Sequence, residues 1–121
     1  MAAGRGDGKR PLRVRLAADI AEIGRGAARV FRRRALRIDQ RVSAEMPEFL
    51  FGLGTVLDTE TARAGILAGA KFIVTPALKP EVIPLCRRYS VPVFAGALTP
   101  TEIITAWEAG ADAVKVFPAE F

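Results

Sequence analysis

The 121-residue sequence contains no histidine. This absence excludes Ser-His-Asp and Cys-His catalysis and any histidine-ligated metal site. The single cysteine, Cys86, cannot form a disulfide framework, which fits a reducing compartment. No apolar run approaches the ~20 residues of a membrane span, and no apolar segment typical of a secretion signal follows the N-terminus. We therefore expect a cytoplasmic protein with no membrane partner.

Charge is unevenly divided along the chain. Residues 1–47 hold 12 Lys/Arg and 5 Asp/Glu, a net charge of +7, whereas residues 48–121 hold 6 and 8, a net charge of −2. The arginines at 32–34 interrupt the one amphipathic helical stretch, Leu16–Val42. We predict that residues 1–47 form an irregular basic segment without a buried parallel strand.

The basic segment has two possible dedicated functions, and the alternative to both is a solvated or poorly ordered helix with no dedicated role. A nucleic-acid-binding arm is disfavoured because no recognition motif and no interleaved aromatic residues accompany the arginines. An organelle transit peptide is disfavoured because Asp19, Glu22 and Asp39 interrupt the segment. We therefore expect no nucleic-acid partner.

Short apolar runs alternate with helical patterns through residues 48–121. The runs cover 49–53, 71–75, 91–95 and 112–117, and the helical patterns cover 58–68, 80–89 and 99–110. Asp58 is a helix N-cap and Gly69 a helix stop, and Thr99 with Glu102 forms a capping box. The alternation predicts an α/β fold with right-handed crossovers and a parallel sheet. Four strands fit half of a (β/α)₈ barrel, and a doubly wound sheet is the alternative.

Lys115 interrupts the last apolar run, 112–117. Burying its ammonium group costs several kcal/mol unless the group is paired or neutral. A neutral lysine is a nucleophile that attacks carbonyl carbons and forms Schiff bases. The alternative is a lysine that extends to the surface from an edge strand. The strand alone leaves both interpretations open.

Four motifs, in order, resemble the 2-keto-3-deoxy-6-phosphogluconate (KDPG) and 4-hydroxy-2-oxoglutarate (KHG) aldolase family. They are Gly52–Leu57, Lys71–Pro76, Val91–Glu102 and Val114–Glu120. The resemblance covers about residues 46–121 and corresponds to the central part of a family member. It implies a partial TIM barrel over residues 48–121, preceded by the basic segment 1–47.

The resemblance also implies a reaction and its residues. Family members are class I aldolases without metal or cofactor, usually homotrimers. They cleave 2-dehydro-3-deoxy-6-phosphogluconate to pyruvate and glyceraldehyde 3-phosphate in the Entner–Doudoroff pathway of carbohydrate metabolism. The Schiff-base lysine corresponds to Lys115, which should lie with Thr55, Pro76 and Gly96 at the carboxyl ends of adjacent strands. The implied substrate-binding residues are Thr55, Pro76, Gly96, Phe117 and Pro118. Strand termination by the prolines and tight packing at the glycine are the alternatives.

Two family features are not recognisable. The family's general acid/base belongs to an E-V-T-x-R motif on the preceding strand, and a gapless alignment puts Ala27 and Phe31 at its glutamate and arginine. Family members also continue through four more strands that carry the phosphate loops. We interpret residues 1–47 as a shifted reading frame or a degraded sequence. We expect a truncated or damaged aldolase with impaired activity; a non-catalytic α/β remnant whose basic arm binds an acidic partner is the alternative.

Overall fold

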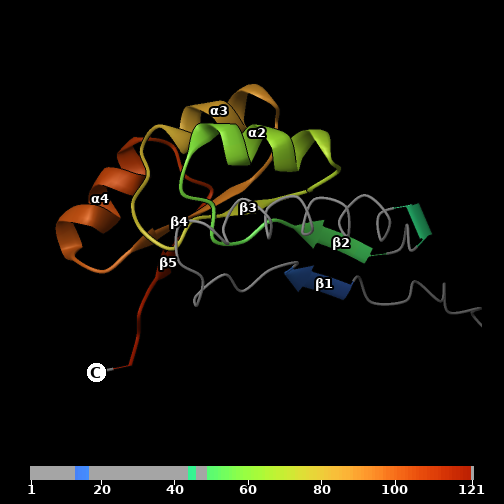
Figure 1. Cartoon of the computed structure of the whole chain (residues 1–121). Coiled ribbons are helices and arrows are strands. Elements are labelled where there is room, and N and C mark those ends of the chain that lie inside the picture. The colour runs from blue at the N-terminus through green and yellow to red at the C-terminus, as the bar shows by residue number, and fades with distance from the viewer. Residues whose placement is uncertain (1–12, 17–43, 46–48, 121) are drawn as a thin grey trace, which may run out of the picture.

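The computed structural model describes residues 13–16, 44–45 and 49–120 (Figure 1). Strands and helices alternate, which confirms the predicted α/β class. None of the described helices is long and apolar enough to cross a membrane. In chain order the elements are β1 (Arg13–Leu16), β2 (Phe49–Gly52), α2 (Thr59–Leu67), β3 (Ile73–Val74), α3 (Val82–Arg88), β4 (Val93–Ala97), α4 (Pro100–Glu108) and β5 (Ala113–Val116).

The ends of α2 and α4 are set by the residues that the sequence singled out. The Asp58 side chain accepts a hydrogen bond from a backbone N–H in the first turn of α2, and Gly69 follows the helix at a φ of 111°. Thr99 and Glu102 form the complete capping box of α4, and Gly110 follows at a φ of 90°. Glycine adopts these left-handed conformations without a steric penalty, so each helix ends there.

All five strands run parallel and follow the order of the chain. β1 pairs with β2, and β3, β4 and β5 pair in succession. An isolated bridge between Leu53 and Ile73 connects the two groups. The carboxyl ends of β2 to β5 therefore lie at one edge, which is where ligands bind in parallel α/β folds.

Residues 1–47, predicted to be irregular and without a buried parallel strand, contribute one parallel strand. β1 lies within this segment and pairs in register with β2, with Arg13 opposite Phe49 and Leu16 opposite Gly52. A parallel ladder is made by backbone groups, so alternate arginines do not prevent pairing. Apart from its first residue, the predicted helical stretch Leu16–Val42 lies outside the described residues, as do Ala27 and Phe31.

The hydrophobic core lies between the sheet and its three helices. In Figure 1, α2 and α3 lie together on one side of the strands, and α4 lies beside β4 and β5. Strand residues such as Ile73, Val93 and Ala95 are almost completely buried against this layer. The helices contribute Ala62, Val82, Ile83, Cys86 and Ala106.

Side-chain alternation leaves a different set of residues on the second face of the sheet. Val74 pairs with Phe94, and Gly96 pairs with Lys115, so these four residues share this face. The lysine therefore lies on the side of the sheet away from the helix-packed core, which positions the candidate site.

Candidate active site

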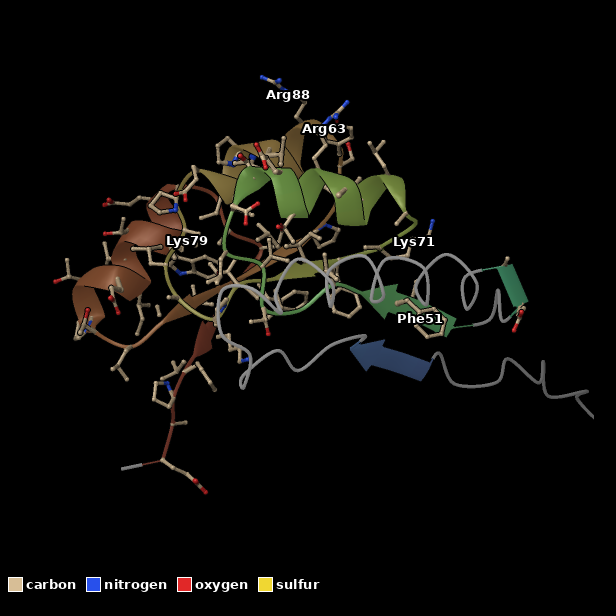
Figure 2. All side chains as sticks on the ribbon, viewed as in Figure 1. Phe51, Arg63, Lys71, Lys79 and Arg88 are labelled. Carbon is tan, nitrogen blue, oxygen red and sulfur yellow. The ribbon has the colours of Figure 1, made fainter. Side chains whose placement is uncertain are left out.

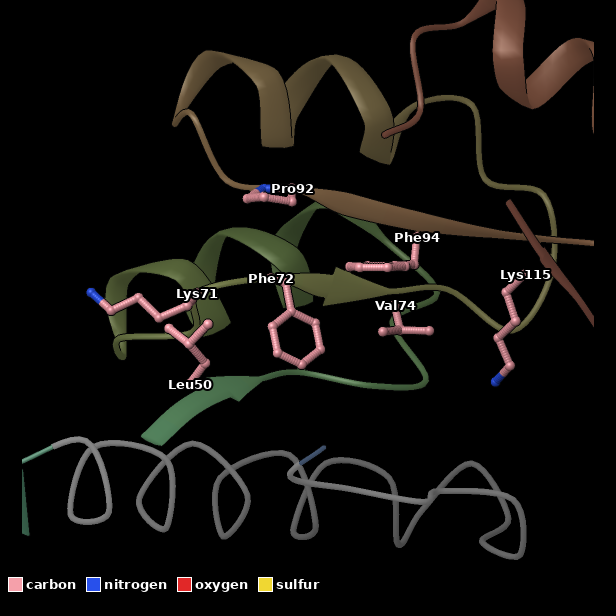
Figure 3. Close-up of a pocket in the computed structure, with 7 residues that line it drawn as sticks. All are labelled: Leu50, Lys71, Phe72, Val74, Pro92, Phe94 and Lys115. Atoms are coloured by element: carbon pink, nitrogen blue, oxygen red, sulfur yellow. The ribbon is translucent and has the colours of Figure 1, made fainter. Parts of the chain in front are cut away.

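A cavity of about 560 Å³ lies on the second face of the sheet (Figure 3). Its lining is mainly apolar, with a lysine from each of two strand regions. Lys71 precedes β3, whereas Lys115 lies near the carboxyl end of β5, so the cavity follows the strand direction. The lining residues are Leu50, Lys71, Phe72, Val74, Pro92, Phe94 and Lys115.

Lys115 is the one predicted site residue that lines this cavity. It is the third residue of β5 and lies opposite Gly96 in the ladder. The lysine is partly buried, and its Nζ atom lies 4.4 Å from the centre of the Phe117 ring. A cation over an aromatic face is attracted by the ring quadrupole. Phe117 therefore contacts the amine at the carboxyl end of the sheet.

Gly96 and Pro76 are in direct contact where β3 and β4 end. A Cβ atom on Gly96 would overlap the Pro76 carbonyl group and lie 2.6 Å from the backbone nitrogen of Ala77. The Gly96 N–H also donates a 3.0 Å hydrogen bond to the fully buried Oγ1 of Thr75. These contacts agree with the alternative that Gly96 serves tight packing at the strand end. The same packing fixes the backbone opposite Lys115.

Thr55 lies in the turn after β2, at the same edge of the sheet. It is partly buried and has a φ of 56°. This left-handed conformation is rare for a β-branched residue, and such backbone strain clusters at functional sites. Thr55 therefore lies at the expected edge of the sheet but does not belong to the cavity lining, and its role in ligand binding stays a prediction.

The four residues Thr55, Pro76, Gly96 and Lys115 lie at the carboxyl side of β2, β3, β4 and β5 respectively. Because neighbouring strands are parallel, these positions share one edge of the sheet. Phe117 is 43% exposed and Pro118 is exposed. Phe117 contacts the lysine from the segment after β5, and Pro118 follows it.

Two carboxylates around the sheet accept hydrogen bonds from the backbone and do not line the cavity. The Glu102 carboxylate accepts hydrogen bonds from the backbone N–H groups of Thr99 and Leu98, which lower its pKa. Asp112 binds the Val93 N–H at the opposite end of the strands. None of the described residues that line the cavity is acidic. Within residues 13–16, 44–45 and 49–120, no group of three or more cysteine or acidic side chains could hold a metal ion.

Sequence reasoning missed two aromatic residues of the cavity, Phe72 and Phe94. Their rings pack edge to face, with centroids 5.7 Å apart and an interplanar angle of 72°. Phe94 is two residues before Gly96 on β4, so strand alternation places it on the lysine's face. That period-two spacing was the signal that could have identified it.

A model of the "KDPG and KHG aldolase" family matches residues 15–121. The chain belongs to this aldolase family. The match begins within β1, well before residue 46, so the family resemblance includes part of the basic segment. The family match therefore starts upstream of residue 46, where the resemblance was expected to begin.

Two curated aldolases show the extent of the similarity. The 2-dehydro-3-deoxy-phosphogluconate aldolase of Haemophilus influenzae is 43% identical over 77 residues, which cover 64% of this chain and 36% of the relative. The 2-dehydro-3-deoxy-6-phosphogalactonate aldolase of Escherichia coli is 44% identical over 78 residues, which cover 64% and 38%. The chain thus matches little more than a third of each relative's length.

Solved aldolases share the fold. A 4-hydroxy-2-oxoglutarate/phosphogluconate aldolase structure superposes with a TM-score of 0.69 at 33% identity, covering 90% of this chain and 60% of that one. The KDPG aldolase of Legionella pneumophila, solved with pyruvate captured as a covalent carbinolamine, superposes with a TM-score of 0.66 at 25% identity. This match covers 70% of the present chain and 41% of the Legionella chain.

The parallel neighbour of β2 on its upstream side is β1, and its sequence is Arg-Val-Arg-Leu. No acidic residue occurs in this strand. The E-V-T-x-R motif is therefore not found in the described strand that pairs with the strand of the Gly52–Leu57 motif.

Proposed function

We propose that this aldolase-family chain retains the nucleophile of a class I aldolase that acts on 2-dehydro-3-deoxy-6-phosphogluconate. The observation that supports it is the position of Lys115 in an apolar cavity near the carboxyl end of a parallel sheet. In the cytoplasm the reaction would serve the Entner–Doudoroff pathway of carbohydrate metabolism. It would yield pyruvate and glyceraldehyde 3-phosphate.

The chemistry begins at the Lys115 amine. The neutral Nζ attacks C2 of the 2-keto acid, and loss of water from the carbinolamine gives an iminium ion. The C4 hydroxyl gives up its proton as the C3–C4 bond breaks, so that C4 becomes the aldehyde carbon. The bonding electrons pass into the iminium and form an enamine. Protonation of the enamine at C3 and hydrolysis of the imine then release pyruvate and free the lysine.

Proton transfer is the step for which the described residues offer no clear catalytic group. The cavity lining contains no carboxylate among the described residues, and Glu102 is engaged in the capping box. Glu120 follows the last strand and is exposed. Loss of a positioned general acid/base costs about 10²–10⁴-fold in rate. We therefore propose that the chain forms the imine but cleaves the sugar acid far more slowly than a full-length relative.

Borohydride reduction in the presence of labelled pyruvate tests the nucleophile. Pyruvate is a suitable probe because the Legionella relative was captured with it as a carbinolamine. Reduction should attach the label to Lys115, and Lys115→Ala should abolish labelling. Lys71→Ala is the matched control, because Lys71 lines the same cavity from the other end of the strands.

Two results would contradict the proposal in different ways. If Lys115→Ala is still labelled, or if the wild-type chain is not labelled at all, Lys115 is not the nucleophile. Either result would favour a non-catalytic remnant. If the wild-type chain cleaves 2-dehydro-3-deoxy-6-phosphogluconate rapidly and Lys115→Ala does not, Lys115 is the nucleophile. The proposal that proton transfer is impaired would then be wrong.

A further inference from the structure

Among the side chains that the structure describes, Thr75 is the one polar side chain that is completely buried. Burying a hydroxyl group costs free energy unless the group forms a hydrogen bond. The Thr75 Oγ1 accepts a 3.0 Å hydrogen bond from the Gly96 N–H, and Gly96 is itself buried. The hydroxyl therefore satisfies a backbone donor in the interior of the protein.

This hydrogen bond takes the place of a ladder hydrogen bond between β3 and β4. The two strands pair in register up to Val74 and Phe94, and the Thr75 N–H still donates to the Phe94 carbonyl. If the parallel ladder continued, the next bond would run from the Gly96 N–H to the Thr75 carbonyl. The Thr75 hydroxyl accepts from that N–H instead. The backbone after Thr75 can therefore leave the strand while the Gly96 donor stays satisfied.

The same glycine lies directly opposite the candidate nucleophile. Gly96 pairs with Lys115 across β4 and β5, and the Pro76 backbone packs closely against it. We propose that Thr75 is a positioning residue for Lys115. Its hydroxyl fixes the end of β4 and, through the pairing of Gly96 with Lys115, the place of the reacting amine. This role rests on the proposed imine chemistry of Lys115.

A hydrogen-bonding role and a packing role for Thr75 predict opposite orders of two variants. Valine has nearly the volume of threonine but no hydroxyl, so Thr75→Val keeps the packing and leaves the buried Gly96 N–H without its acceptor. Serine keeps the hydroxyl and lacks the buried methyl group, so Thr75→Ser retains the acceptor at the cost of a small cavity. If the hydroxyl positions Lys115, the serine variant traps pyruvate faster than the valine variant. If packing alone matters, the valine variant is the faster one.

The experiment measures how fast labelled pyruvate becomes attached to Lys115 under excess cyanoborohydride, which reduces the iminium and leaves pyruvate intact. Peptide mass spectrometry assigns the label, because Lys71 and Lys79 also carry amines (Figure 2). Thr75→Val should lower the maximal rate about tenfold or more, since misplacing a reacting group costs up to ~10²-fold. The pyruvate concentration at half-maximal rate should not change, because the loss falls on the covalent step and not on binding. Thr75→Ser should trap pyruvate at close to the wild-type rate.

Thr105→Val is the matched control. The Thr105 hydroxyl donates to the Thr101 carbonyl within α4, and neither residue lines the cavity. The same substitution at this position should leave trapping unchanged. Amide hydrogen exchange adds a readout that does not require the imine. The Gly96 N–H should exchange much faster in Thr75→Val than in the wild type, and it should stay protected in Thr75→Ser.

Several results would overturn the positioning role and leave the proposed function intact. They are wild-type trapping by Thr75→Val, slower trapping by Thr75→Ser than by Thr75→Val, and unchanged exchange of the Gly96 N–H in Thr75→Val. If Thr75→Val does not fold, Thr75→Ser decides alone: a folded serine variant with normal trapping supports the role of the hydroxyl, and one with a large loss of trapping refutes it. A wild-type chain that is not labelled at Lys115 refutes the proposed function, and the positioning role with it.

Discussion

Gly96→Ala should destabilise the carboxyl edge of the sheet and disturb the amine beside it. The added methyl group would overlap the Pro76 carbonyl and lie 2.6 Å from the Ala77 nitrogen. Both neighbours are backbone, which cannot rotate away as the end of a side chain can. The ends of β3 and β4 must therefore separate, and β4 carries Gly96 directly opposite Lys115.

The expected cost can be worked out from two contributions. Overpacking of a well-packed site costs about 1–3 kcal/mol. Displacing β4 also strains the buried hydrogen bond from the Gly96 N–H to Thr75 Oγ1, which is worth about 1 kcal/mol. The sum is roughly 2–4 kcal/mol, and for a domain of this size it lowers the melting temperature by about 10 °C or more.

The matched control is Gly65→Ala. In α2 the new methyl would meet Leu53 Cδ2 at 2.5 Å, which is the end of a flexible side chain. Alanine also gains about 1 kcal/mol over glycine in a helix interior, so the two effects nearly cancel. Urea unfolding followed by circular dichroism gives the free energy of unfolding of each variant, and borohydride trapping of pyruvate reports on Lys115.

We therefore expect Gly96→Ala to lose both stability and trapping, whereas Gly65→Ala should retain both. If Gly96→Ala unfolds at the same urea concentration as the wild type, the contact with Pro76 does not constrain this edge. A destabilised Gly96→Ala variant that traps pyruvate normally would show that Lys115 is positioned independently of β4.

Three further predictions concern residues outside the cavity. Thr99→Ala removes the N-cap of α4 and should lower the free energy of unfolding by about 1 kcal/mol in urea titrations; unchanged stability would mean that the capping box is not formed in solution. The pKa of Glu102 is lowered in the fold by the Thr99 and Leu98 N–H groups, so its stabilisation is complete above its unfolded pKa of about 4.3 and is lost as the pH falls through the folded value. Glu102→Gln should therefore flatten the acid side of the stability profile, and an unchanged slope would contradict this. Burial, with a smaller effect of the Asp112 charge, raises the pKa of Cys86 to about 11, so iodoacetamide at pH 8 should label it only after unfolding; rapid labelling of the folded chain would disprove this burial.

Local signals in the sequence predicted the elements from residue 49 onward. Asp58, Gly69 and the Thr99 capping box act through backbone groups within a few residues, so their patterns identify helix ends without knowledge of the tertiary fold. Strand bounds were less well predicted. The run 71–75 contains only the two-residue β3, because a strand is defined by pairing with its neighbours and not by the apolar run itself.

β1 and the cavity show what local patterns miss. Arg13 and Arg15 alternate with Val14 and Leu16, and a search for apolar runs passes over this pattern. The pairing with β2 depends on residues 36 positions away in the register. The aromatic contact between Phe72 and Phe94 likewise requires two strands to be brought together. By contrast, the family motif around Lys115 is local, and it identified this lysine as a candidate without knowledge of the tertiary fold.

The order of the sheet has a consequence for how the chain reaches its fold. Ile73 pairs with Val93, and Phe94 pairs with Ala113, so β4 and β5 each close a loop of about 20 residues onto the strand made just before them. Short loops cost little entropy to close and favour fast folding. A nascent chain can therefore add one βα unit at a time during synthesis, with each new unit using the previous one as its template.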